Sequence, residues 1–473
     1  MYLLNVQCMQ VNIIVIALLH CSQLFICLRS WSLIFWAHCF SRAPDNITLY
    51  ASSFIKPLVT KLVARYGLLT VLKNFTFRVG TEPNTSPGHW DDGVEKYVDM
   101  YVAVEAAIQS VLEGRGRVGP GNFCPFYEPG RGCNRTNGGL GTTVVPIVQG
   151  IVARSNLSFI SGSFYGGASG CGKPGKTCGY DPSLADLASQ GLRYIRKVAG
   201  PRFSEVPLTF MEFGTLGNAH GRISPEPGAF GAAWTVHASA RAAAQGISRA
   251  FHWKIFDSIG TRGRSLYYSS AWVTAAARHV FGSSGRIVVL NLTSAIQSPR
   301  ASTSQSSGAV EVAGIGGPME RTRSGAGFGA LVAFFSSDKK CTDNASAVVQ
   351  FACPAPGGCS HSPSAVSVRV MNKSTSTFDQ LHTDAVKFGW AAHNDSEVYP
   401  INVMLNRAGQ EALRNNSIAQ RYLAIQTRSF SPLSANDNPG VTVTCDSNGS
   451  ACQLNIMYVT PPSVFAIQVV WKV

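Results

Sequence analysis

The sequence predicts an α/β fold, a parallel (β/α)8 barrel, followed by an all-β sandwich domain. Two observations lead to this prediction. From residue 54 to about residue 281, segments with helical spacing alternate with short apolar segments typical of strands, which is the pattern of βα units in a parallel sheet. Beyond residue 284 the apolar runs are short and are separated by Ser, Gly, Asn and Pro, as in antiparallel sandwiches.

The individual elements follow from the spacing of apolar residues. Helices are expected at 54–67, 94–113, 144–153, 184–198, 229–245 and 269–280. Strands of the first region are expected at 74–79, 117–120, 157–161, 207–211 and 249–255. Strands of the second region are expected at 287–292, 331–335, 348–352, 366–370, 403–405, 441–444 and 465–471. The stretch 297–327 is rich in Ser, Gly and Arg and is expected to be a long or partly disordered loop.

Composition limits the class of protein. The chain has 473 residues, of which 45% are apolar and 14% charged, so it can bury a sizeable core. Its formal charge of +14 favours acidic partners, and a merely basic solvated surface is an equally weighted alternative. No dense Lys/Arg run with interleaved aromatics occurs, so we expect no nucleic-acid partner.

Cysteine usage indicates an oxidising compartment. Four of the 13 cysteines lie in the first 40 residues, and the other nine come mostly as near neighbours, which short disulfide-closed loops explain. The expected pairs are Cys124 with Cys133, Cys171 with Cys178, Cys445 with Cys452, and Cys341 with Cys353 or Cys359. Nine is odd, so one thiol is left over. No CxxC pair occurs, and the spacings do not suit a zinc module, so no metal is expected.

Eleven Asn-x-Ser/Thr sequons agree with secretion. They lie at Asn46, Asn74, Asn84, Asn134, Asn156, Asn291, Asn344, Asn372, Asn394, Asn415 and Asn448. Residues 1–45 are predicted to be an apolar leader, a signal anchor or a wrongly assigned gene start. Residues 11–19 suit the apolar part of a signal peptide, although no Lys or Arg precedes them, and apolar residues continue to residue 40, as in a membrane anchor.

Two glutamates stand where apolar strands are expected to end. Glu82 follows the strand at 74–79, and Glu212 follows the strand at 207–211. In parallel barrels the chemistry lies at the carboxyl ends of the strands, and an isolated carboxylate in so apolar a run is costly to bury unless it is paired or functional. Two further strands lie between them, so we expect Glu82 and Glu212 three strands apart, facing across the barrel mouth as a catalytic pair.

The motifs around these glutamates resemble glycoside hydrolase family 39 of clan A, which includes β-xylosidases and α-L-iduronidases. The run Gly80-Thr81-Glu82-Pro83-Asn84 stands where the family has Trp-Asn-Glu-Pro-Asn after its fourth strand, and it follows a similar helix end, Arg65-Tyr66-Gly67. The segments 118–120, 159–165, 210–213 and 251–253 resemble the fifth to eighth strands. The resemblance covers 54–473, by motifs as far as 281 and by architecture beyond.

The resemblance implies a secreted glycosidase that acts on a polysaccharide or its fragments by retaining double displacement. Glu212 would be the nucleophile and Glu82 the acid/base. The expected substrate-binding residues are Thr81, Asn84, Trp90, Tyr165 and Trp253. Tyr165 would bond to Glu212 and Trp90 would stack on a sugar, but a core tyrosine and a packed loop aromatic are equally weighted alternatives. No cofactor is expected.

Three departures from the family pattern concern the site and the barrel. Thr81 replaces the asparagine that holds the sugar 2-hydroxyl, and Ser163 replaces a histidine two residues before the sixth-strand tyrosine. Only one strand, at 31–36, fits before the strand leading to Glu82, whereas a closed barrel needs three. We therefore expect a leader at 1–45, a (β/α)8 barrel incomplete at its N-terminal strands at 46–283, and the sandwich at 284–473.

The alternative to a glycosidase is a non-catalytic carbohydrate-binding or cell-surface protein derived from such an enzyme. Residues 170–177 match a phosphate-loop pattern, but Pro174 removes an amide donor and no helix start follows, so nucleotide binding is not expected. The basic charge mildly favours an acidic carbohydrate. Membrane contact is expected only through an N-terminal anchor, and the sequence gives no indication of the oligomeric state.

Overall fold

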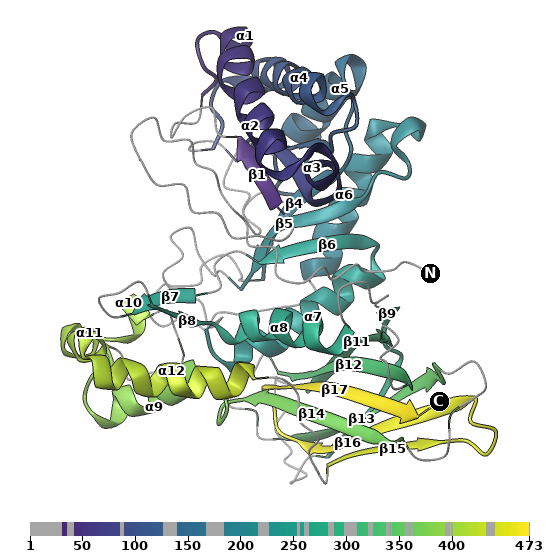
Figure 1. Cartoon of the computed structure of the whole chain (residues 1–473), viewed down its shortest axis with the longest axis vertical. Helices are drawn as coiled ribbons and strands as arrows, with labels where there is room; N and C mark the ends of the chain where they lie inside the picture. Colours follow the sequence, from purple (N-terminus) through teal and green to yellow (C-terminus); the bar gives the residue numbers. More distant parts are fainter. Residues whose placement is uncertain are drawn as a thin grey trace.

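The computed structural model places two regions along the chain, one built on parallel strands and one on antiparallel sheets (Figure 1). It describes residues 31–35, 42–85, 89–125, 140–166, 184–215, 227–252, 256–259, 264–281, 288–297, 310–319, 325–336, 341, 343–354, 359, 363–392, 398, 401–431 and 440–472. Among them, no helix is both long and apolar enough to cross a membrane.

Six parallel strands are present in the described residues, and they lie side by side in chain order. They are β1 (Trp31–Phe35), β2 (Phe75–Val79), β3 (Val118–Pro120), β4 (Ile160–Tyr165), β5 (Leu208–Gly214) and β6 (Ile247–His252). An isolated parallel bridge from Phe123 to Gly162 joins the sheet β1-β2-β3 to the sheet β4-β5-β6. Pairing of β1 with β2 confirms the strand expected near 31–36.

Helices alternate with these strands, as the apolar spacing predicted. The helices are α1 (Ile47–Tyr50), α2 (Lys56–Tyr66) and α3 (Leu68–Asn74) before β2, α4 (Gly93–Leu112) before β3, α5 (Val145–Arg154) before β4, α6 (Leu184–Ala199) before β5, and α7 (Ala229–Ala244) before β6. A hairpin of β7 (Phe256–Ile259) and β8 (Arg264–Tyr267) precedes α8 (Ser269–Phe281). In α4 the buried residues Tyr97, Tyr101, Val104 and Ile108 recur at helical spacing, so one face packs inward.

Within the described residues, β1 to β6 are six parallel strands of a (β/α)8-type barrel. Among the described residues β1 and β6 are the outermost strands of the parallel series, whereas a closed barrel has no edge strands. Of the described strands, only β1 comes before β2, which leads to Glu82.

Two antiparallel sheets form the sandwich. One has the order β14-β17-β12-β11-β9 and the other β10-β13-β16-β15. Their strands are β9 (Val288–Val289), β10 (Leu292–Gln297), β11 (Glu311–Pro318), β12 (Gly325–Phe335), β13 (Asn344–Ala352), β14 (Ala365–Asn372), β15 (Val441–Cys445), β16 (Ala451–Val459) and β17 (Ser463–Lys472). Phe328 of one sheet stacks on Phe351 of the other at 3.8 Å between ring centroids, in the core between the sheets.

Two expectations for this region are wrong. The stretch 297–327, expected as a loop, contains β11, because its glycines allow close packing: a Cβ on Gly316 would lie 2.5 Å from Leu290 Cδ2. The strand expected at 403–405 is instead the helix α10 (Ile401–Met404). It belongs to a helical insertion between β14 and β15 that the sequence analysis did not identify, with α9 (Thr377–Lys387), α11 (Arg407–Arg414) and α12 (Asn416–Phe430).

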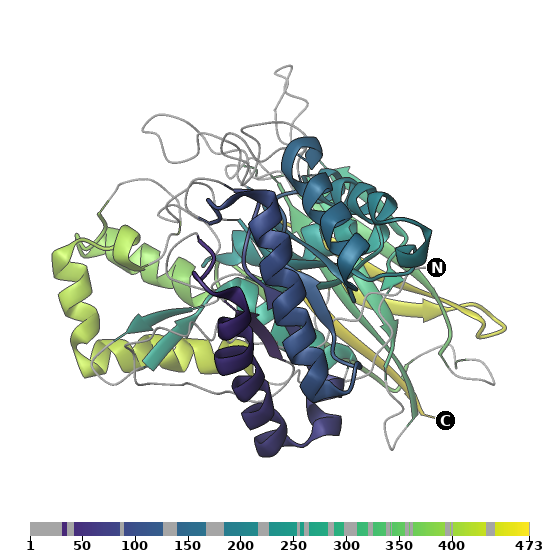
Figure 2. The ribbon, with the colours of Figure 1, turned by 90° about the horizontal axis from the view of Figure 1, so that it is seen from above.

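The helices α7 and α8 lie between the parallel strands and the sandwich (Figure 1). Phe230 of α7 contacts Phe335 of β12 with 5.0 Å between ring centroids, and Arg241 of α7 pairs with Glu311 of β11 at 3.5 Å. Seen from above, the insertion α9–α12 lies on one side of the molecule and the strand ends of the sandwich on the other (Figure 2). The domain division at 283/284 stays a prediction.

The disulfides agree only in part with the expected pairs. Cys445–Cys452 is present. Cys353 pairs with Cys359 across a separation of six residues, so the expected bond from Cys341 is wrong, and Cys341 is the left-over thiol among the described cysteines. Cys124 is disulfide-bonded. Cys133, Cys171 and Cys178 lie outside the described residues.

Candidate active site

Glu82 lies in a tight turn directly after the buried strand β2. Gly80 has φ 76°, in the left-handed region that glycine adopts without strain. Glu82 itself has φ 40°, which is uncommon for a residue with a side chain and is typical of functional sites. The backbone N–H and the hydroxyl of Thr85 both donate to the Glu82 carbonyl, at 2.9 and 2.8 Å, and so hold the turn in this conformation.

Neighbouring elements anchor this turn. The Tyr97 hydroxyl of α4 donates to the Val79 carbonyl at 2.7 Å and accepts from the Gly121 N–H at 2.8 Å. The Asn84 amide donates to the Cys124 carbonyl at 3.0 Å and accepts from the Cys124 N–H at 2.9 Å. These buried bonds tie the turn to the segment after β3, so the Glu82 backbone is positioned from two sides.

Glu212 lies inside β5, at an irregularity in the strand. Against β4, Gly162 pairs with Phe210 and Ser163 pairs with Glu212, so Met211 is an extra residue on β5. The register against β6 also shifts between Phe210 and Phe213. Such a bulge re-aims the side chains near it and is common beside active sites.

Three side chains from two strand ends, those of β2 and β4, hold the Glu212 carboxylate. Arg78 Nη2 lies 3.2 Å from Oε1, and the Tyr165 hydroxyl donates to Oε2 at 2.9 Å. The Thr81 hydroxyl lies 3.2 Å from Oε1 and 2.9 Å from Asn122 Oδ1, and its single proton serves one of them at a time. Glu212 and Arg78 are only 6% and 1% exposed, so this is a buried ion pair.

Burial of Glu212 and the positive charge of Arg78 shift the pKa of Glu212 in opposite directions. Loss of water around the carboxylate raises the pKa of Glu212 above its ordinary value, and the nearby Glu82 raises it further. The Arg78 guanidinium and the hydroxyls of Tyr165 and Thr81 oppose this rise. Because the charge of Glu82 acts on the pKa of Glu212, the two glutamates, three strands apart as expected, lie within electrostatic reach of each other.

The surroundings of Glu82 differ from those of Glu212. Its carboxylate Oε2 lies 3.0 Å from Nδ1 of His89 and 3.3 Å from the Thr85 hydroxyl. Glu82 is 5% exposed, whereas the His89 side chain is 40% exposed. A solvent-accessible imidazole therefore contacts the buried carboxylate.

The expected substrate-binding residues differ in what they contact. Thr81 and Tyr165 contact Glu212, and Asn84 anchors the turn of Glu82. Trp90 is 7% exposed, donates from its indole nitrogen to the Gly93 carbonyl at 2.7 Å and meets the Tyr97 ring edge-on at 5.3 Å. These contacts fit the packed-aromatic alternative for Trp90. Trp253 lies outside the described residues.

Sequence reasoning missed Arg78 and His89. The signal for Arg78 was present, because it is the one charged residue in the five-residue buried strand β2, and a buried charge requires a partner. The same argument singled out Glu212. His89 was not singled out, since nothing in the sequence relates an imidazole seven residues on to the Glu82 carboxylate.

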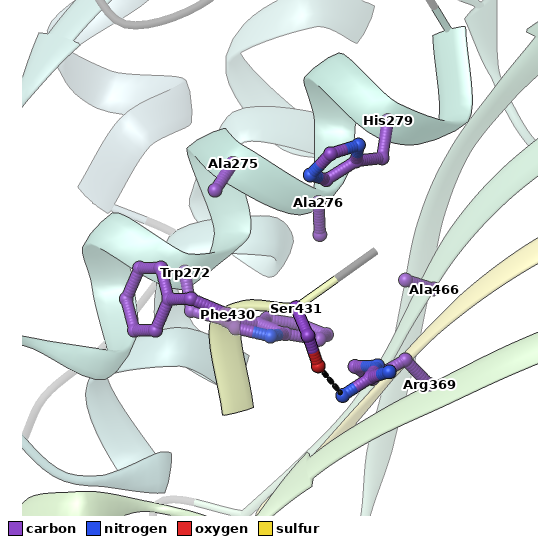
Figure 3. A pocket seen from close by; sticks show the side chains of 8 residues that line it. All are labelled: Trp272, Ala275, Ala276, His279, Arg369, Phe430, Ser431 and Ala466. Carbon is purple, nitrogen blue, oxygen red and sulfur yellow. Dashed lines mark hydrogen bonds between the residues drawn. The ribbon is translucent and has the colours of Figure 1, made fainter. Parts of the chain in front are cut away.

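A separate depression lies between α8, α12, β14 and β17 (Figure 3). Its lining includes Trp272 and His279 of α8 and Arg369 of β14, whose guanidinium donates to the Ser431 hydroxyl at 2.9 Å. It contains neither Glu82 nor Glu212. Among the described residues no group of three or more His, Cys, Asp or Glu side chains could hold a metal ion.

Solved structures similar to this chain are glycoside hydrolases. A GH39 enzyme from Xanthomonas axonopodis pv. citri matches with a TM-score of 0.55 at 13% identity, over 91% of this chain and 74% of that chain. A monomeric β-xylosidase from Caulobacter crescentus CB15 matches with a TM-score of 0.55 at 14% identity, over 91% and 76%. The chain has the fold of the family 39 glycoside hydrolases.

The family 39 fold accounts for both regions of the chain. A bacterial orthologue of human α-L-iduronidase also matches, with a TM-score of 0.52 at 13% identity, over 91% of this chain and 66% of that chain. No protein-family model and no curated protein matches. The resemblance seen in the sequence is thus confirmed at the level of the fold.

Proposed function

We propose that this protein is a retaining glycosidase, with Glu82 as the acid/base and Glu212 as the nucleophile, that hydrolyses O-glycosidic bonds of a poly- or oligosaccharide. One observation carries the proposal. Two buried glutamates come from strands three apart, the charge of Glu82 acts on the pKa of Glu212, and Arg78, Thr81 and Tyr165 all contact the Glu212 carboxylate. Two carboxylates with different environments are what a double displacement needs.

The contacts of each glutamate suit its proposed role. Arg78 and Tyr165 stabilise the ionised form of Glu212, which must attack the anomeric carbon as a carboxylate. In the proposed mechanism Glu82 carries the proton before the reaction, and Glu212 is the carboxylate beside the Arg78 cation. Glu82 then protonates the leaving oxygen as the glycosidic bond breaks and the bond from Glu212 to the sugar forms.

The second half of the reaction reverses these roles. The Glu82 carboxylate takes a proton from water as the water oxygen attacks the anomeric carbon and the ester bond to Glu212 breaks. Retention requires the two carboxyl groups to be about 5–5.5 Å apart. The anchored turn of Glu82 and the bulge at Met211 are the features that would set this separation.

The compartment and the substrate class are also part of the proposal. Two disulfides among the described residues and the eleven sequons support secretion. The formal charge of +14 supports an acidic carbohydrate over a neutral one.

The test compares Glu82→Gln and Glu212→Gln with the wild type on a panel of aryl glycosides. Both variants are expected to lose hydrolysis, and added azide is expected to restore turnover only in Glu82→Gln, giving a glycosyl azide of retained configuration. Glu205→Gln, at an exposed position just before β5, is the matched control and should retain activity. A wild-type protein without activity on the whole panel would instead favour the non-catalytic carbohydrate-binding alternative.

A further inference from the structure

The contact between Glu82 and His89 is not used by the mechanism above. His89 Nδ1 lies 3.0 Å from Glu82 Oε2, within hydrogen-bond distance. A hydrogen bond also links the His89 N–H to the Thr85 carbonyl at 3.3 Å, and Thr85 in turn donates to the Glu82 carbonyl at 2.8 Å. The imidazole is therefore held beside the carboxylate by the same turn that positions Glu82.

The two groups differ in their access to water. Glu82 is 5% exposed, whereas the His89 side chain is 40% exposed. Imidazole is the side chain that ordinarily gains or loses a proton between pH 5 and 8, and it has a nitrogen on each side of its ring. A ring that contacts a buried carboxyl through Nδ1 and is partly open to solvent can exchange protons with water at Nε2.

We propose that His89 is a positioning residue whose charge alternates with that of Glu82 during turnover. This inference rests on the proposed function. With Glu82 protonated, a neutral His89 ring donates its Nδ1–H to Glu82 Oε2, and its Nε2, on the solvent side, carries no proton. When Glu82 has given its proton to the leaving oxygen, Nε2 takes a proton from water and the imidazolium balances the new carboxylate. When Glu82 recovers a proton from the attacking water, His89 returns its own proton to solvent, so the proton count closes.

The charged surroundings are consistent with this alternation. Arg78 on β2 and Tyr165 on β4 act on Glu212 of β5, so the cation of β2 is engaged with the other carboxylate. In the segment of His89 itself, Asp92 accepts from the Ala43 N–H at 2.6 Å. Because Glu212 becomes a neutral ester in the intermediate, Glu82 is then the carboxylate that needs a counter-charge, and the described contact that supplies one is His89.

A titration tests the pair without any substrate. The protonation of His89 is followed by NMR of protein labelled at histidine Cε1, with the signal assigned by its loss in His89→Asn. The midpoint of His89 should fall by about one pH unit in Glu82→Gln, because an opposite charge in contact favours the imidazolium. His279→Asn, which removes the exposed histidine of α8, serves as the matched control and should leave the His89 midpoint unchanged. Equal midpoints in wild type and Glu82→Gln would overturn the inference.

Kinetics then separate the pair from the proposed function. In the wild type, an imidazolium at His89 stabilises the Glu82 carboxylate, so Glu82 loses its proton at a lower pH than it would without the cation. The basic limb of the kcat/KM profile, which reports loss of the acid's proton, should therefore move to higher pH in His89→Asn, which keeps a hydrogen-bonding group near the Nδ1 position but cannot titrate. If this limb lies at the same pH in His89→Asn as in the wild type, the inference about His89 is wrong, and the glycosidase proposal is unaffected. If the titration shows the coupling but the protein hydrolyses no glycoside, the proposed function is wrong. The Glu82–His89 pair then exists but has no role in turnover.

Discussion

Replacing Arg78 by Met tests whether the buried ion pair holds Glu212 ionised. Arg78 is 1% exposed and Glu212 is 6% exposed, so the substitution leaves a buried carboxylate without its cation. Removing one partner of a buried ion pair costs about 3–5 kcal/mol of unfolding free energy, whereas replacing both by neutral groups is often close to neutral. Arg78→Met should therefore lose about 3–5 kcal/mol at neutral pH, and the double variant with Glu212→Gln should lose much less than the sum of the two single losses.

Urea-induced unfolding of the wild type, the two single variants and the double variant measures these losses. The pH dependence has a defined sign, because burial already raises the pKa of Glu212 and loss of Arg78 raises it further. A carboxyl with a raised pKa in the folded state stabilises the fold below its unfolded pKa and loses that contribution as the pH rises. The deficit of Arg78→Met should thus be smallest below about pH 4 and grow toward neutral pH. A loss under about 1 kcal/mol at neutral pH, or strict additivity in the double variant, would refute the reasoning.

Three further predictions concern single contacts. Tyr165→Phe should lower kcat/KM on an aryl glycoside about tenfold to a hundredfold, because a hydrogen bond to a charged group is worth about 1.5–3 kcal/mol, and an unchanged rate would contradict it. Asp379 of α9 accepts from the Ala229 N–H at the start of α7 at 2.7 Å, so Asp379→Ala should destabilise by about 1–2 kcal/mol in thermal unfolding and Asp379→Asn by less; equal losses would count against this cap. Asn84→Ala strands the buried backbone groups of Cys124 and should cost at least about 2 kcal/mol in urea unfolding, and a neutral effect would show that water replaces the amide.

Much of the parallel region could be predicted from the sequence because its signals are local. Apolar spacing located α2 and the helices from α4 to α8 to within a few residues but missed α3, and short apolar runs located β2 to β6. The same runs placed Glu82 after β2, but they ended the strand of Glu212 at residue 211, whereas Glu212 lies inside β5, two residues before that strand ends. The side chains that contact Glu212 come from other strands and turns, so these contacts depend on the fold.

The features that the sequence did not reveal depend on distant contacts. The glycines of β11 look like a loop until Leu290 and Phe328 are seen to occupy the space that side chains would fill. Arg78 reads as one charge in a strand until Glu212, 134 residues further on, is beside it. His89 stands in the sequence as one more polar residue beside Trp90, until its Nδ1 is seen 3.0 Å from Glu82 Oε2. The local spacing of apolar and polar residues does not predict any of these three contacts.

The bridge between Asn84 and Cys124 has a consequence for biosynthesis. Asn84 heads a sequon, yet in the folded chain its amide is 1% exposed and bonds to the backbone in both directions. An oligosaccharide attached to that nitrogen has no room beside Cys124. In a host that glycosylates nascent chains, the Asn84 side chain can therefore either receive a glycan or bond to Cys124 and close the turn that carries Glu82. Each event excludes the other. The share of molecules able to assemble the site is then set by which event comes first during synthesis.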